Sequence, residues 1–189
     1  MNNLDEAKKE ILGRLEELKV VCATGNAWVF VCAAALLDYL SHLVNGENKG
    51  AQGYKDFVTT WMSQVNNKYS NFTYINGKSD LSVQMYHVLR CGLVHSLSLI
   101  PDPKAVDRGG RDRSIVLCHR AESIEKGLPH LSPYNKGVIS DAAVFVAEEF
   151  INDIEEAIKL IFIKAKQDAV LKDNILKWLS QHPIIIGGY

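Results

Sequence analysis

The sequence lacks the features that mark several large classes of protein. Its longest uninterrupted apolar run, residues 27–37, has eleven residues, whereas a membrane-spanning helix needs about 20. The first ten residues mix charges of both signs and lack the basic-then-apolar order of a secretory signal. The cysteines include no Cys-x-x-Cys pair, so we interpret them as reduced structural residues. We therefore expect a cytoplasmic protein that does not enter a membrane.

Common cofactor and hydrolase motifs are also absent. The chain contains no Walker phosphate loop, no Gly-x-Gly-x-x-Gly fingerprint and no nucleophile elbow. No cysteines and histidines stand at the spacings of a zinc site. From the sequence we expect neither a cofactor nor a metal ion.

The chain has no overall charge of one sign, since 21 basic residues face 22 acidic ones. Proteins bind nucleic acids largely through cations that neutralise phosphates, so any contact with RNA must come from a local basic patch. The one candidate patch lies at 102–120, where Arg108, Arg111 and Arg113 predict contacts with RNA phosphates. The alternative is that these are the solvated charges of a hairpin.

With 189 residues, 47% of them hydrophobic, the chain is long enough for one core, and we expect a single domain, 1–189. Apolar residues recur at helical spacing in six stretches. These predict helices at about 4–20, 26–44, 54–65, 80–99, 140–165 and 168–180.

The stretch between the fourth and fifth predicted helices has a different character. Gly109-Gly110 separates 105–108 from 111–118, which is typical of a hairpin, and glycines and prolines follow as far as Gly137. The predicted fold is therefore all-α, a bundle of about five to six helices formed by 4–100 and 140–181. A small β-hairpin or irregular insertion is expected near 102–139.

The most informative stretch is 82–96, which reads SVQMYHVLRCGLVHS. Its Arg90 and His95 have the spacing Arg-x-x-x-x-His inside a helical pattern. A second match to the looser spacing of four to six intervening residues, Arg113 and His119, spans apolar residues typical of a strand. The neighbouring Tyr86, Leu89, Gly92 and Leu93 complete the phrase. This phrase resembles the signature helix of the HEPN superfamily, which consists of small helical domains, many of them ribonucleases.

The resemblance implies a HEPN-like fold and cleavage of RNA without a metal, as in stand-alone prokaryotic HEPN domains of defence or toxin systems. His95 would take a proton from a ribose 2′-hydroxyl or give one to the leaving oxygen, and Arg90 would stabilise charge on the phosphoryl group. The products would be a 2′,3′-cyclic phosphate and a 5′-hydroxyl. The family often has a polar residue directly after the arginine, where this chain has Cys91.

Geometry adds a condition to this mechanism. Residues five apart on a regular α-helix lie about 140° apart around the axis, so one such helix makes a poor site. Family members typically dimerise along the signature helices, which brings two arginines and two histidines together. A homodimer through this helix is therefore part of the prediction, and an antitoxin or other partner protein is expected as well.

Three residues are predicted to support the site, namely Asp38, Tyr86 and Cys91. Asp38 lies in the most apolar predicted helix and either orients a catalytic group or forms a purely structural pair with Arg90. In the structural case, the chain is a non-catalytic HEPN-like dimeric module that binds a partner protein, a nucleotide or RNA. A third possibility is a structural protein that oligomerises through the apolar seam of 144–165.

Overall fold

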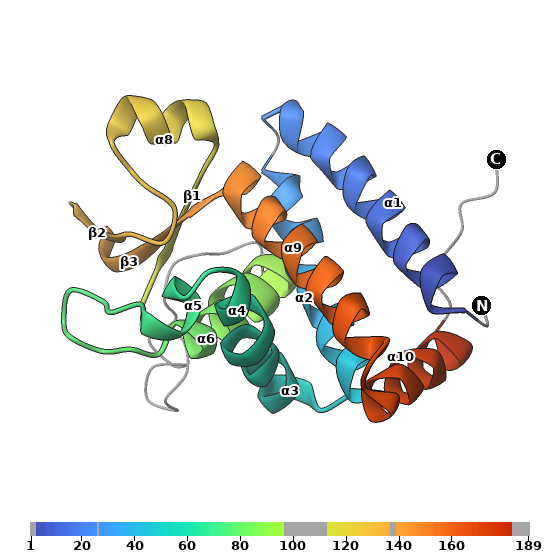
Figure 1. The fold of residues 1–189 in the computed structure, drawn as a ribbon. Helices are drawn as coiled ribbons and strands as arrows, with labels where there is room; N and C mark the ends of the chain where they lie inside the picture. The colour runs from blue at the N-terminus through green and yellow to red at the C-terminus, as the bar shows by residue number, and fades with distance from the viewer. Residues whose placement is uncertain (1–2, 26, 97–112, 137–138, 183–189) are drawn as a thin grey trace.

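Most of the chain folds into helices that pack around one central helix, α2 (Figure 1). The computed structural model describes residues 3–25, 27–96, 113–136 and 139–182, and the side chains of 93–96 and 139–140 lie outside that description. Helix α2, Trp28–Asn45, contacts five other helical elements. These are α1 (Leu4–Ala23), α3 (Gly50–Phe57), η2 (Met85–Ser96), α9 (Ala147–Ala165) and α10 (Ala169–Gln181).

The first two helices begin and end as their sequences predict. Asn3 caps α1 by accepting a hydrogen bond from the backbone N–H of Asp5 at 2.7 Å. Helix α2 ends at Gly46, whose left-handed φ of 66° is unfavourable for other residues. By length and composition α2 is apolar enough to cross a membrane, but 56% of it is buried inside the protein. This is the arrangement of a core helix.

A nearly continuous helical segment follows and buries the aromatic side chains of Tyr54 and Phe57. It consists of α3, the wider turns of η1 (Val58–Met62) and α4 (Ser63–Val65), and a short helix α5 (Lys68–Asn71) comes next. Phe72 and Tyr74 are buried in the connection after α5, whereas the apolar side chain of Ile75 is 55% exposed.

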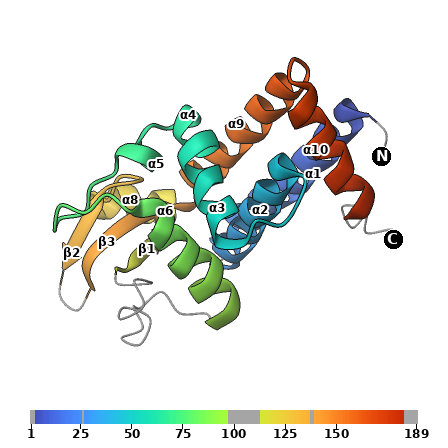
Figure 2. The ribbon, with the colours of Figure 1, turned by 90° about the horizontal axis from the view of Figure 1, so that it is seen from below.

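The stretch that contains Arg90 is helical but does not form a regular α-helix. After one α-helical turn, α6 (Leu81–Gln84), the backbone continues as the π-helix η2 (Met85–Ser96). The predicted helix at 80–99 is thus helical as far as Ser96, and 97–99 lie outside the described residues. In Figure 2 this segment lies beside α2, which it contacts.

A small sheet interrupts the helices and shows where the sequence prediction fails. Its strands are β1 (Ile115–Cys118), β2 (Pro133–Lys136) and β3 (Ile139–Val146), in the order β1-β3-β2. Strand β3 is parallel to β1 and antiparallel to β2. The predicted helix at 140–165 is therefore wrong before Ala147, because 140–146 belong to the middle strand. The described side chains of that strand are mostly buried on both faces. The strand therefore lacks the alternation of apolar and polar residues that marks a strand with one exposed face.

The strand-like character of 115–117 is confirmed, although β1 pairs with β3 rather than across a hairpin at Gly109-Gly110, which lies outside the described residues. Helix α8 (Arg120–Lys126) follows β1 and sits above the sheet in Figure 1. The protein is thus mainly α-helical with a three-stranded mixed sheet, where the sequence predicts an all-α bundle. One buried cluster runs through the helices from Leu4 to Leu179 and includes residues of β1 and β3.

Candidate active site

Arg90 and Asp38 meet where η2 packs against α2. The Arg90 Nε and Nη2 donate to one carboxylate oxygen of Asp38, at 3.2 and 3.1 Å. Both side chains remain partly accessible, at 30% for Arg90 and 20% for Asp38. The predicted contact between these residues is therefore present. Because both side chains are partly exposed, the pair is not sealed inside the core.

His42 extends this polar group along α2. Its Nε2 lies 3.8 Å from the second carboxylate oxygen of Asp38, and its ring packs 5.1 Å from that of Trp178 on α10. Burial lowers the pKa of His42, although the Asp38 carboxylate opposes the shift. Partial burial would also lower the pKa of Arg90, but the hydrogen bond and charge of Asp38 outweigh it, so that pKa is raised. Arg90 stays a cation, and His42 is neutral near pH 7.

Tyr86 and Cys91, both predicted to support the site, lie beside Arg90. The Arg90 guanidinium carbon is 5.9 Å from the centre of the Tyr86 ring, within the range of a cation–π contact. The Cys91 thiol interacts with both Arg90 and Tyr86. Burial, followed by the effect of Cys91, raises the pKa of Tyr86. Cys91 thus contacts both Arg90 and the aromatic ring beside it.

Tyr54 belongs to the same group, and nothing in its sequence context indicates so. It comes from α3, is fully buried, and packs edge-on against Tyr86 with ring centres 5.7 Å apart. Its hydroxyl has no hydrogen-bond partner within the described part of the chain. Burial and then the charge of Asp38 raise its pKa. A buried hydroxyl without a partner is costly and uncommon. The Tyr54 hydroxyl is therefore a hydrogen-bonding group beside the site that no described residue satisfies.

His95 lies on η2, but its side chain is outside the described residues. The backbone nevertheless changes the geometric expectation. A π-helix is bonded from residue i to residue i+5, so backbone positions five apart follow one another on one side of the helix. Positions 90 and 95 are therefore closer to a common face than on a regular α-helix.

Of the three arginines in the predicted RNA-binding patch, the structure describes only Arg113, and that residue is buried. Arg108 and Arg111 lie outside the described residues, and Arg113 is only 1% exposed. Its Nη1 donates to Asp80 at 3.0 Å, its Nε is 3.5 Å from Asp141, and its guanidinium carbon is 4.9 Å from the Tyr74 ring centre. Arg113 thus fastens the sheet to the start of α6 and cannot contact RNA from this position.

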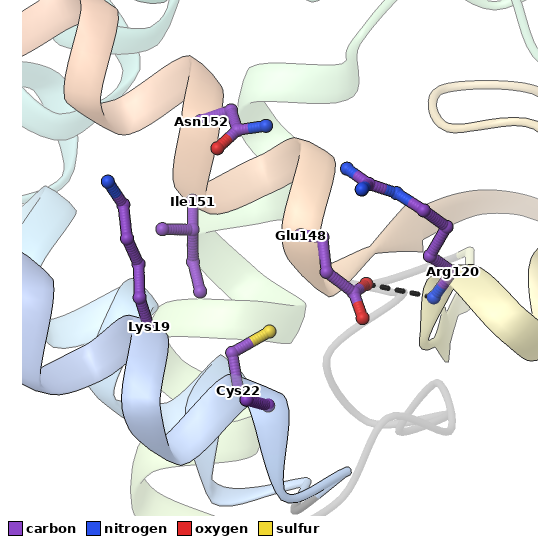
Figure 3. Close-up of a pocket in the computed structure, with 7 residues that line it drawn as sticks. Lys19, Cys22, Arg120, Glu148, Ile151 and Asn152 are labelled. Carbon is purple, nitrogen blue, oxygen red and sulfur yellow. Dashed lines mark hydrogen bonds between the residues drawn. The ribbon is translucent and has the colours of Figure 1, made fainter.

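A separate group of metal-ligand types lies at the other end of α2. Donor atoms of Cys22, His119 and Glu148 all lie within 4.8 Å of one another. Two of these residues line a cavity of about 230 Å³, shown in Figure 3. The cavity is lined by Lys19, Cys22, Ala23, Arg120, Glu148, Ile151 and Asn152. No motif indicates this group, because its members are far apart in the sequence.

His130 illustrates a buried histidine that is already satisfied. Its Nδ1 accepts a hydrogen bond from the Val146 N–H at 3.0 Å, so this nitrogen carries no proton. Its Nε2 lies 3.4 Å from both Asp153 and the Tyr69 hydroxyl. With both ring nitrogens engaged, His130 joins β3, α9 and α5 and offers no free group for chemistry.

No protein-family model, curated protein or solved structure matches this chain. Functional inference therefore depends on the residues and their geometry.

Proposed function

We propose that this protein is a HEPN-like, metal-independent endoribonuclease whose catalytic residues are Arg90 and His95. The observation that carries the proposal is the form of the helix that bears them. Met85–Ser96 is bonded with a period of five residues, and the two residues are five apart. A helix of this form favours their joint action on one phosphate group, which a regular α-helix disfavours.

The chemistry follows from the two side chains. An imidazole titrates near pH ~6.5 and can exchange a proton at neutral pH, so His95 takes the proton of the ribose 2′-hydroxyl. The 2′-oxygen then bonds to phosphorus while the bond from phosphorus to the 5′-oxygen breaks. A second imidazole protonates that leaving oxygen. Arg90 stays protonated and binds the phosphoryl oxygens, where negative charge develops.

Asp38 acts as a positioning residue in this proposal. It holds Arg90 through two nitrogens of the guanidinium, Nε and Nη2. Because the Arg90 side chain is 30% exposed, a phosphate can approach the guanidinium from solvent. Cys91 and Tyr86 limit the rotation of the same side chain from the helix itself.

The proposal includes a homodimer formed along η2, since the reaction needs a base for the 2′-hydroxyl and an acid for the leaving oxygen. Each copy contributes one His95, so two copies supply both groups. The partner in the cell would be a second copy of this chain, with an inhibitory antitoxin protein added if the protein acts in a prokaryotic defence or toxin system.

The test is cleavage of end-labelled single-stranded and structured RNA in excess chelator. Wild type, Arg90→Ala and His95→Ala are compared with His87→Ala, a matched control on the same helix. We expect wild type and His87→Ala to leave 2′,3′-cyclic phosphate ends, and the two site variants to lose at least about 100-fold in rate. If wild type is inactive on all RNAs while folded, or if the site variants cleave equally well, the proposal fails.

A second candidate function is a non-catalytic dimeric module that binds a partner protein, a nucleotide or RNA. It is favoured by the contact between Arg90 and Asp38, which is also what a structural pair would look like. Overexpression separates the two, because an unrestrained ribonuclease arrests growth and His95→Ala relieves the arrest. A binding module is tolerated in both forms.

A further inference from the structure

The cluster of Cys22, His119 and Glu148 joins three segments that are far apart in the sequence. Cys22 lies in the last turn of α1, His119 directly precedes α8, and Glu148 is in the first turn of α9. Their donor atoms lie within 4.8 Å of one another. One thiol, one imidazole and one carboxylate from three elements form a donor set that zinc proteins use.

His119 and Glu148 already have the separation that a zinc ion requires. The Nδ1 atom of His119 lies 3.4 Å from a carboxylate oxygen of Glu148. Two ligands at about 2.1 Å from a tetrahedral ion are about 3.4 Å apart. Cys22 completes the triangle after a shift of about 1 Å at most, because zinc–sulfur bonds of about 2.3 Å place the sulfur about 3.6 Å from either ligand.

His119 supplies an independent observation that points to a missing ligand. Both of its ring nitrogens are buried, and neither has a hydrogen-bond partner among the residues that the structure describes. The ring also packs against the ring of Phe30, at a centroid distance of 6.1 Å. Buried imidazole nitrogens are normally bonded to something. An ion at Nδ1 would satisfy the nitrogen that faces Glu148.

Glu148 is oriented as metal-binding carboxylates are. One of its oxygens accepts a hydrogen bond from the backbone N–H of Arg120 at 2.8 Å, drawn as a dashed line in Figure 3, and the other is the oxygen near His119. A carboxylate fixed through one oxygen presents the second in a defined direction. The neighbouring cations do not compete for it, because Lys19 is bound to Glu155 and the Arg120 side chain to Glu149.

A catalytic cysteine is the main alternative use of this cluster, and the surroundings of Cys22 oppose it. The residue is 4% exposed, so its sulfur is closed to a substrate. Nucleophilic cysteines have accessible sulfurs. Buried thiols of this kind become thiolates when a metal cation binds.

We propose that Cys22, His119 and Glu148 bind one Zn²⁺ ion, with the fourth coordination position open toward the cavity of about 230 Å³. A thiolate and a carboxylate together cancel the charge of the ion, and the sulfur ligand selects zinc over magnesium or calcium. The ion ties the end of α1 to the junctions β1–α8 and β3–α9. The open position accepts a water molecule or a small anion from the cavity.

The first experiment titrates Zn²⁺ into the full chain after chelator treatment and dialysis, against a competing metal indicator. Wild type binds one equivalent, and Cys22→Ala, His119→Gln and Glu148→Gln each weaken binding by at least about 100-fold. Matched controls are Cys32→Ala, an exposed cysteine, and Glu149→Gln, the neighbouring acid. Both controls bind as wild type does. A wild type that binds no zinc, or site variants that bind as tightly as the controls, would overturn the site.

A second measurement does not depend on whether the variants fold. Co²⁺ added to the wild type in place of zinc gives a thiolate-to-cobalt charge-transfer absorption if Cys22 is a ligand, and tetrahedral d–d bands if the geometry is as proposed. Absence of the charge-transfer absorption in wild type that has bound Co²⁺ refutes the assignment of Cys22. Far-ultraviolet circular dichroism on each variant shows whether lost binding reflects lost ligation or unfolding.

Discussion

Arg113 is the residue whose replacement should reveal most about how the sheet is attached to the helices. Its side chain is 1% exposed and is held by Asp80 and Asp141, whose side chains are 31% and 18% exposed. Removing one partner of a buried ion pair costs about 3–5 kcal/mol. In Arg113→Met the two carboxylates keep access to water, so we expect the lower end, about 3 kcal/mol.

The opposite perturbation should cost more. In the double variant Asp80→Asn, Asp141→Asn the guanidinium keeps its charge but has almost no access to water, so the loss should approach about 5 kcal/mol. For a chain of this length 1 kcal/mol corresponds to about 2–4 °C in Tm. Arg113→Met should therefore lower Tm by roughly 6–12 °C, and the double variant by more.

The assay is urea unfolding and thermal melting followed by circular dichroism, with Arg14→Met as the control. Arg14 pairs with Glu17 on the surface, where both side chains are exposed, so its replacement should cost less than about 1 kcal/mol. Adding Arg113→Met to the double variant should recover stability, because it removes a buried charge whose two carboxylate partners have been neutralised. If Arg113→Met is no more destabilising than Arg14→Met, or if the triple variant is less stable than the double, the account of a buried ion pair is refuted.

Two further predictions concern α2. Gly46→Ala should destabilise the protein by about 1–2 kcal/mol because alanine disfavours the left-handed φ of this position. It should cost about 1 kcal/mol more, because the new Cβ would lie 2.9 Å from the Oδ1 of Asn174, a residue that caps the last turn of α2. Gly25→Ala, at a φ of 71° with open space around it, should show only the first cost in the same denaturation assay. Because burial lowers the pKa of His42 in the folded state, the unfolded state binds more protons below pH ~6.5. Stability should thus fall as pH drops from 7.5 toward 5.5, and the urea midpoint of His42→Gln should fall less; an equal decrease in both proteins would contradict this.

The long helices were predictable because each has apolar residues at helical spacing and a recognisable end, whereas α8 lies inside the stretch predicted as an insertion and buries no residue. The Asn3 cap, the Gly46 stop and the Asp168 cap of α10 all appear where side-chain chemistry places them. Strand β3 was not predictable, because it lacks a periodic pattern of its own. A strand covered on both faces shows no alternation, and the run at 142–146 continues without a break into the apolar face of α9. A run of this kind is compatible with either structure.

The candidate active site was partly predictable. The contact between Arg90 and Asp38 follows from an isolated acid in an apolar helix and an arginine in another. The π-helical form of Met85–Ser96 has no local signal in the sequence. Tyr54 reads as one member of an aromatic stripe, and only packing places its hydroxyl beside the site. Arg113 looked like a surface charge because a basic residue between Gly-Gly and a strand usually is one.

The zinc ligands could not be predicted from the sequence, because they come from elements that are far apart in it. Zinc motifs are recognised by short spacings, and here three elements meet only after the bundle and the sheet have formed. Phe30, which contacts His119, and Asp38, which holds Arg90, are both on α2, and eight residues of helix separate them by about 12 Å. The metal cluster depends on α1, α8 and α9, whereas the Arg90 group depends on α2, α3 and η2. Arg90→Ala should therefore bind zinc as wild type does, and the RNA assay in excess chelator measures the protein without its metal, so that each proposal can fail while the other stands.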